Sequence, residues 1–161
     1  MSWKTVSSKK VYENRWMKVV EDEVETDTGR KLIYGLVHKK PFVLLIPWSG
    51  AHLTLVRQYR YPIGATTWEF PQGHLEHDSI EEAARAELRE ETGLRAREIK
   101  EIGHIHLAAS FSSQEGVIFL ATGLTQGETD REESEEDMDA WQFALDEFRQ
   151  MVKDGKITDS P

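Results

Sequence analysis

The chain has 161 residues, of which 39% are hydrophobic and 30% are charged, and it has a formal net charge of −9 and no cysteine. The length suits one compact domain, the missing cysteines exclude disulfides and thiolate chemistry and fit a cytoplasmic location, and the negative charge argues against extended nucleic acid as a ligand. No stretch reaches the roughly 20 apolar residues of a membrane span, and the N-terminus does not read as a secretory signal.

The N-terminal part of the chain predicts an antiparallel sheet. Residues 4–13 and 16–26 are extended segments, and residues 27–30 (DTGR) are typical of a turn, so residues 31–38 return beside the second segment. We therefore expect residues 1–40 to form an N-terminal β segment of their own.

Two apolar runs then predict a second hairpin. Residues 42–47 form the longest apolar stretch and predict a buried strand, and residues 52–59 follow after a link that contains Ser49 and Gly50. With these strands begins the main domain, residues 41–161.

Strands and two helices make up the rest of the chain. A short extended segment is predicted over residues 68–71, strands over 99–107, 117–122 and 138–144, and helices over 80–92 and 146–153. Residues 125–137 are acidic and poor in apolar side chains, which predicts a mobile loop. The fold class is therefore α+β, a mixed sheet with helices packed on it.

The helix over residues 80–92 has clear signals at both ends. Ser79 is a good N-cap, and Glu82 follows it at the spacing of a capping box. Gly93 stands where a left-handed residue commonly ends a helix.

The predicted buried face of this helix begins apolar and ends acidic. At about 100° per residue, Glu87 and Glu91 fall within about 20° of Ile80 on the apolar stripe, and Glu90 lies beside them. Carboxylates there would suffer desolvation, mutual repulsion and the unfavourable helix C-terminus. A divalent cation relieves all three penalties, and carboxylate oxygens suit Mg²⁺ or Mn²⁺. The alternative is a solvated acidic face, which most Glu-rich helices have.

The same helix carries a recognisable order of glutamates, an arginine and a glycine. Residues 87–94 read ELREETGL, and they follow Gly73 in the chain. Residues 73–94 resemble a Nudix box, which reads Gly, five residues, Glu, seven residues, then Arg-Glu-apolar-any-Glu-Glu-any-Gly-apolar.

The first half of the box departs from that motif. One residue is missing after the glycine, and Asp78 replaces the glutamate. Ala86 stands where the family has an arginine that makes an ion pair within the helix, so Arg85 or Arg89 would have to replace it.

Residues 57–62 (RQYRYP) and 68–73 (WEFPQG) are similar to the ADP-ribose pyrophosphatase branch of the Nudix family. The resemblance implies a Nudix-like α/β/α fold, a mixed β-sheet sandwiched between helices, with an N-terminal antiparallel strand segment that helps to form a homodimer. It also implies a metal-dependent hydrolase that cleaves the pyrophosphate of a nucleoside diphosphate linked to another moiety, with ADP-ribose or a nucleotide sugar as the substrate.

The resemblance also assigns the metal site. The carboxylates of Glu87, Glu90 and Glu91 and the backbone carbonyl of Gln72 would bind Mg²⁺ or Mn²⁺, and Gly73 would let that backbone approach closely. The three glutamates are catalytic in this scheme, because a bound metal lowers the pKa of water and aligns it for attack on the pyrophosphate.

A glutamate on a late loop is the expected general base. Four candidates are present, Glu132, Glu133, Glu135 and Glu136. We favour Glu136, because it lies just before a predicted strand, and we expect most of the other three to be solvated loop residues without a role.

Substrate contacts are expected from Arg57, Trp16, Glu115 and Glu69. Arg57 and Arg60 point to opposite faces of one strand, so at most one of them enters the site, and we favour Arg57. A plain surface arginine is an equally good interpretation, and so is a core or dimer contact for Trp16. Glu115 ends the segment after the box, where this branch usually has a glutamate.

Two other functions remain open. Residues 71–73 (PQG) hint at a hydrolase of dinucleoside polyphosphates or capped ends, although the net charge and the WEFP context favour ADP-ribose. The imperfect first half of the box suggests a non-catalytic nucleotide-sensing module. The intact Glu87, Glu90 and Glu91 argue against it, because a sensor needs no metal cluster.

Overall fold

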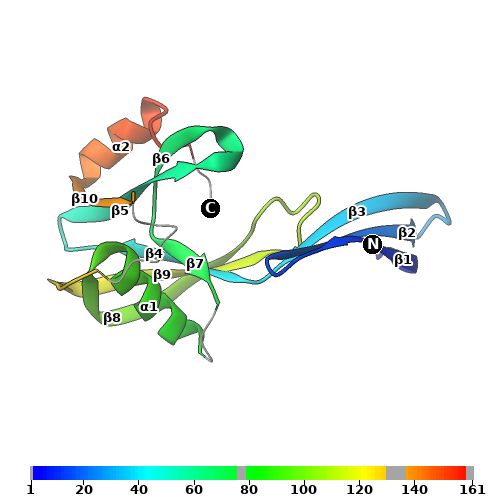
Figure 1. Cartoon of the computed structure of the whole chain (residues 1–161), viewed down its shortest axis with the longest axis horizontal. Helices are drawn as coiled ribbons and strands as arrows, with labels where there is room; N and C mark the ends of the chain where they lie inside the picture. The colour runs from blue at the N-terminus through cyan, green and yellow to red at the C-terminus, as the bar shows by residue number, and fades with distance from the viewer. Residues whose placement is uncertain (1, 76–78, 130–136, 159–161) are drawn as a thin grey trace. The chain divides into compact units, whose positions relative to one another are not determined.

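The structure is a computed structural model, and it describes residues 2–75, 79–129 and 137–158. The chain divides into two compact units (Figure 1). The first unit comprises Met1–Pro41 and Ile105–Gly116, and the second comprises Phe42–His104 and Val117–Pro161. Within the described ranges, no helix is long and apolar enough to cross a membrane.

The first unit is built on the predicted antiparallel sheet. Its strands, in the order β1-β2-β3, are β1 (Lys4–Glu13), β2 (Met17–Glu25) and β3 (Lys31–Lys39). Gly29 takes a φ of 79° in the predicted turn, where a left-handed residue is needed. Val20, Asp22 and Val24 are alternate residues of β2, and all three are buried on one of its faces.

The second unit contains two sheets and both helices. A three-stranded antiparallel sheet has the order β10-β5-β6, and a four-stranded sheet has the order β7-β4-β9-β8. The strands are β4 (Phe42–Pro47), β5 (His52–Arg60), β6 (Ala65–Glu69), β7 (Gln72–His74), β8 (Leu94–His106), β9 (Glu115–Gln126) and β10 (Asp139–Ala144). The helices are α1 (Ile80–Thr92) and α2 (Leu145–Lys153), and a 3-10 turn, η1, spans Tyr61–Ile63. The predicted α+β class is confirmed.

The main core lies between α1 and the four-stranded sheet. Ala83, Ala84 and Leu88 of α1 pack against apolar side chains of β4 and β9. The sheet contributes Val43, Leu45, Val117, Phe119 and Ala121, all at most 5% exposed. Small alanines let the helix backbone come close to the sheet, and this fixes which α1 positions face inward.

The prediction of a second hairpin from residues 42–47 and 52–59 is wrong. β4 and β5 lie in different sheets, and an isolated bridge joins Trp48, just after β4, to Leu53 of β5. The reason is burial: Leu44 and Leu45 are both buried, so β4 is covered on both faces inside its own sheet.

The short extended segment predicted over residues 68–71 is only partly a strand: Trp68 and Glu69 end β6, and residues 70 and 71 belong to no strand. β6 ends at Glu69 and β7 begins at Gln72, each in a different sheet. Pro71 separates them because it has no amide to donate to a strand ladder, although its carbonyl accepts a hydrogen bond from the Leu45 amide at 2.8 Å.

Candidate metal and substrate site

Both ends of α1 are capped as the sequence predicts. The Ser79 hydroxyl accepts a hydrogen bond from the Glu82 amide at 3.0 Å, which confirms the N-cap. Gly93 has a φ of 71°, and its amide donates to the Arg89 carbonyl at 2.8 Å. These caps fix where the helix begins and ends, while the packing of its alanines on the sheet fixes which glutamates face inward.

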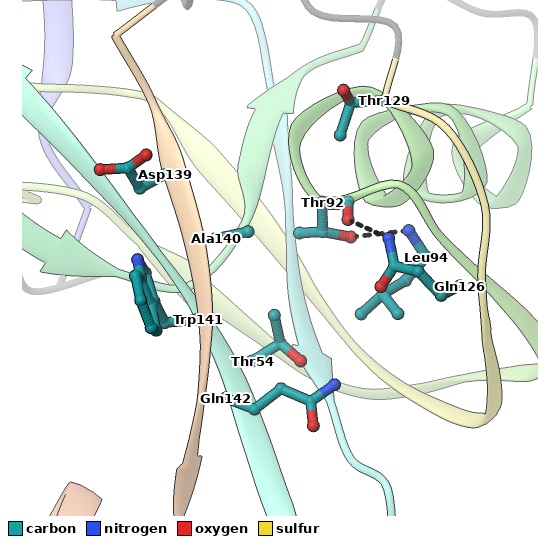
Figure 2. Close-up of a pocket in the computed structure, with 9 residues that line it drawn as sticks. All are labelled: Thr54, Thr92, Leu94, Gln126, Thr129, Asp139, Ala140, Trp141 and Gln142. Atoms are coloured by element: carbon teal, nitrogen blue, oxygen red, sulfur yellow. Dashed lines mark hydrogen bonds between the residues drawn. The ribbon is translucent and has the colours of Figure 1, made fainter.

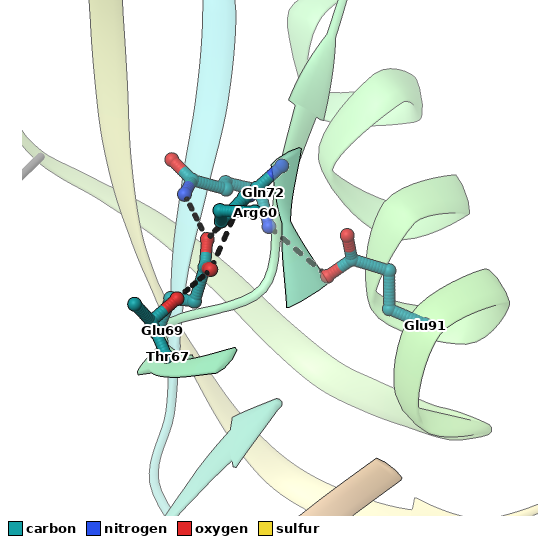
Figure 3. Close-up of polar contacts among 5 residues, drawn as sticks. All are labelled: Arg60, Thr67, Glu69, Gln72 and Glu91. Carbon is teal, nitrogen blue, oxygen red and sulfur yellow. Dashed lines mark hydrogen bonds and ion pairs between the residues drawn. The ribbon is translucent and has the colours of Figure 1, made fainter. Parts of the chain in front are cut away.

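Glu91 lies on the buried face of α1, as its angular position around the helix predicts. The residue is 3% exposed, among alanines and Leu88 that are almost fully buried. Its Oε2 accepts a hydrogen bond from the backbone amide of Gln72 at 3.1 Å (Figure 3). A buried carboxylate is therefore held against the first residue of β7.

Glu87, one turn earlier, lies against the next residue of β7. A Cβ built on Gly73 would lie 1.9 Å from Glu87 Oε1, so the carboxylate occupies the space that a side chain would need. Gly73 does not have a positive φ, so the glycine is required here for room and not for backbone conformation. The group that comes close to Gly73 is the Glu87 side chain, and the expected approach of the Gln72 backbone to a metal ion stays a prediction.

Two ion pairs lie on α1 itself. Arg89 Nη2 donates to Glu90 Oε1 at 2.9 Å, and the Glu90 side chain is 27% exposed. Arg85 pairs with Glu81 one turn away at 2.8 Å and donates to a main-chain carbonyl of β8 at 2.9 Å. Both arginines thus make ion pairs near Ala86, which is itself buried.

The oxygens at this place fit a hard divalent cation. Glu87 and Glu91 bring carboxylates from successive turns to β7, and Glu90 is partly exposed on the same helix. In the part of the chain that the structure describes, no three acidic, histidine or cysteine side chains form a ready metal cluster. An ion would have to draw these carboxylates together when it binds.

A second buried carboxylate, Glu69, lies on the other side of Gln72 (Figure 3). Arg60 Nε donates to its two oxygens at 2.9 and 3.1 Å, and Arg60 Nη2 donates to Oε2. The Thr67 hydroxyl donates to Oε1 at 2.5 Å, and Gln72 Nε2 donates to Oε2 at 2.9 Å. Groups of the protein itself therefore surround this carboxylate.

These contacts lower the pKa of Glu69. Burial raises the pKa, but the hydrogen bonds from Arg60 and Thr67, the positive charge of Arg60 and the hydrogen bond from Gln72 together hold it below its ordinary value. The ionised side chain therefore stabilises the fold at pH values above its pKa in the unfolded chain. That contribution is lost as the pH falls through the lower pKa of the folded state.

Arg57 and Arg60 lie on opposite faces of β5, as expected for residues three positions apart. Arg57 lies opposite Trp68 in the β5–β6 register, and its guanidinium carbon lies 5.7 Å from the centroid of the Trp68 ring. Arg57 Nη2 also donates to Asp139 Oδ2 at 2.8 Å, and both of these side chains are about half exposed.

Other predicted residues lie apart from these contacts or outside the described ranges. Trp16 and Glu115 belong to the first unit, where both are exposed, and the Arg15 guanidinium lies 4.1 Å from the Trp16 ring. The four candidate bases, Glu132, Glu133, Glu135 and Glu136, lie outside the described residues, as does Asp78. Their assigned roles stay predictions.

A pocket of about 380 Å³ lies at the C-terminal end of α1 (Figure 2). It is lined by Thr54, Thr92, Leu94, Gln126, Thr129, Asp139, Ala140, Trp141 and Gln142. Gln126 Nε2 donates hydrogen bonds to the carbonyls of Thr92 and Gly127, both at 3.1 Å. Among the described residues that line the pocket, Asp139 is the one charged side chain, so this lining offers polar contacts but no positive charge for a phosphate.

Comparison with known proteins covers almost the whole chain. The family model of the NUDIX domain matches residues 38–160, and that of the nucleoside diphosphate sugar hydrolase N-terminal domain matches residues 3–37. A methanol dehydrogenase activator of Bacillus methanolicus is 27% identical, and an ADP-ribose pyrophosphatase of Bacillus subtilis is 25% identical. Each of these alignments spans 98% of this chain and 86% of the relative. A crystal structure of an ADP compounds hydrolase is similar in fold, with a TM-score of 0.86 at 22% identity over 99% of this chain and 87% of that chain.

Proposed function

The chain belongs to the Nudix family, and from that membership we propose that it is a metal-dependent hydrolase of nucleoside diphosphates linked to another moiety. ADP-ribose or a nucleotide sugar is the proposed substrate class. Relatives along nearly the full length of the chain include a protein named ADP-ribose pyrophosphatase, which supports this choice. The match of residues 3–37 to a nucleoside diphosphate sugar hydrolase domain supports it further.

The observation that carries the proposal is the pair of carboxylates on the inner face of α1. Glu91 is 3% exposed and is hydrogen-bonded to Gln72, and Glu87 fills the space beside Gly73. Two carboxylates that one helix brings to the same place suit a hard divalent cation. A bound Mg²⁺ or Mn²⁺ would supply a water of lowered pKa and screen the negative charge of the pyrophosphate.

We propose that Glu87, Glu90, Glu91 and the Gln72 carbonyl hold this ion. The helix delivers the three carboxylates, and the start of β7 delivers the carbonyl. Arg57, Trp16 and Glu115 are the proposed substrate contacts. The guanidinium of Arg57 would bind a phosphate by paired hydrogen bonds, and the indole of Trp16 would stack on a base.

A nucleotide panel tests the proposed function. With Mg²⁺ or Mn²⁺ present, we expect phosphate-containing products from ADP-ribose or nucleotide sugars, and no activity after chelation. Faster cleavage of dinucleoside polyphosphates or capped ends would favour that alternative class. Absence of cleavage for every compound, together with nucleotide binding, would identify a sensing module instead.

The general base provides a second test. Glu136→Gln removes the proton acceptor but keeps the size of the side chain, so the turnover rate is expected to fall by about 10²-fold or more while metal affinity changes little. Steady-state kinetics and Mn²⁺ titration measure the two quantities. An unchanged turnover rate would move the role to Glu133, Glu135 or Glu115.

We propose a cytoplasmic homodimer, and the N-terminal unit supports the dimer. Large apolar side chains are exposed on this unit, each at least 36%: Trp3, Val6, Val11, Tyr12, Trp16, Met17 and Ile33. Exposed apolar groups in this number are typical of an interaction surface. Light scattering at micromolar concentration should give twice the chain mass, and a monomer mass would contradict the dimer.

A further inference from the structure

Glu69 and Glu91 are buried carboxylates on two different elements, and one residue, Gln72, contacts both. The Gln72 side chain donates to Glu69 at 2.9 Å, while its backbone amide donates to Glu91 at 3.1 Å. We propose that Glu69 is a positioning residue, which acts through Gln72 to hold Glu91 in place for a divalent cation, and that it is not the substrate ligand predicted from the sequence. This inference rests on the proposed function.

The burial of Glu69 is the first argument. Its side chain is 1% exposed, and its oxygens accept hydrogen bonds from Arg60, Thr67 and Gln72. A substrate ligand needs an accessible oxygen with a free direction for a hydrogen bond. A carboxylate enclosed in this way is suited to holding its own neighbours in fixed orientations.

The second argument is the place of Gln72 between two fixed partners. Gln72 lies opposite Leu44 in the β4–β7 register, and the preceding carbonyl, of Pro71, is bonded to the Leu45 amide. The strand ladder therefore fixes the main chain from one side. The hydrogen bond to Glu69 fixes the side chain from the other, so the direction of the Gln72 amide toward Glu91 has little freedom.

The third argument is the role that Arg60 plays in this group. Its guanidinium neutralises Glu69 and is itself only 38% exposed. Without that ion pair the carboxylate would be a buried and uncompensated charge, which is strongly destabilising. The ion pair therefore allows a charged, strong hydrogen-bond acceptor to stand where it can hold the Gln72 side chain.

Gln72→Leu is the direct test, because it removes the side-chain hydrogen bond and keeps the backbone amide and carbonyl. We expect the affinity of the otherwise intact protein for Mn²⁺, measured without substrate by calorimetry, to fall about tenfold, which is typical when an outer partner of a metal ligand is lost. Thr67→Val is the matched control. It removes a different hydrogen bond from the same Glu69 carboxylate, so it should lower thermal stability but leave Mn²⁺ affinity within about twofold.

A double-mutant cycle separates positioning from a purely structural role. Glu69→Leu removes the acceptor of the hydrogen bond whose donor Gln72→Leu removes, so it is expected to weaken Mn²⁺ binding at least as much. The double variant should be no weaker than the worse single variant, because both changes remove the same contact. Additive losses, or unchanged Mn²⁺ affinity in Gln72→Leu, would overturn the positioning role while leaving the proposed function intact. A wild-type protein that neither binds Mn²⁺ nor cleaves any nucleotide would overturn both.

Discussion

Glu91→Gln is expected to lower turnover by at least about 10²-fold and to remove most of the stabilisation of the fold by Mg²⁺ or Mn²⁺. The substitution keeps the shape of the side chain, and its amide oxygen can still accept the hydrogen bond from Gln72. Only the negative charge is lost. In the wild-type protein, the ion should raise the melting temperature by an amount that grows with the logarithm of free ion above its dissociation constant.

The metal-free behaviour of this variant makes the test specific. Because Glu91 is 3% exposed, removal of its charge should leave the apo protein equally stable or slightly more stable. Glu82→Gln is a matched control, since it removes the same charge from an exposed position of the same helix. That control should keep the ion-dependent shift in melting temperature. If Glu91→Gln kept both this shift and full activity, the assignment of α1 as a metal-binding helix would be wrong.

Gly73→Ala is expected to have an effect of similar size on turnover through a different residue. The new Cβ would lie 1.9 Å from Glu87 Oε1 and about as close to the rest of that carboxylate. The flexible glutamate would give way more readily than the strand, so the fold should survive while the carboxylate leaves its position. Turnover should fall about 10²-fold, because one charged group is displaced from the metal site.

Gly35→Ala provides the control for this substitution. Gly35 is also a strand glycine without a positive φ, and a Cβ there would meet nothing within 4 Å. It should leave turnover and Mn²⁺ affinity unchanged. Turnover by Gly73→Ala at the wild-type rate would show that the observed position of Glu87 is not needed for catalysis.

The helix and its carboxylates could be predicted because they depend on local signals. Ser79 and Gly93 mark its ends, and a periodicity of 3.6 residues then fixes the inward direction of Glu91. The N-terminal strands were equally accessible, since one turn with a glycine joins two segments of alternating pattern. In these cases the sequence neighbours are also the neighbours in space.

The group around Glu69 could not be predicted, because it depends on which strands pair. The sequence placed β5 beside β4, whereas the structure pairs β5 with β6 and β10. With the observed register, Arg60 and Glu69 have side chains on the same face of the β5–β6 hairpin, nine residues apart. An acid and a base on one face of a hairpin would have been the signal, but only once the correct partner strand was known.

The chain passes from one sheet of the second unit to the other within the segment between Glu69 and Gln72. This short link couples the two sheets, because it is too short to absorb a change in the distance between them. Loosening of the three-stranded sheet by heat or mild denaturant would be transmitted to the Gln72 peptide and then to Glu91. The protein should therefore lose its hold on metal, and with it catalysis, at a lower temperature than the one at which α1 unfolds.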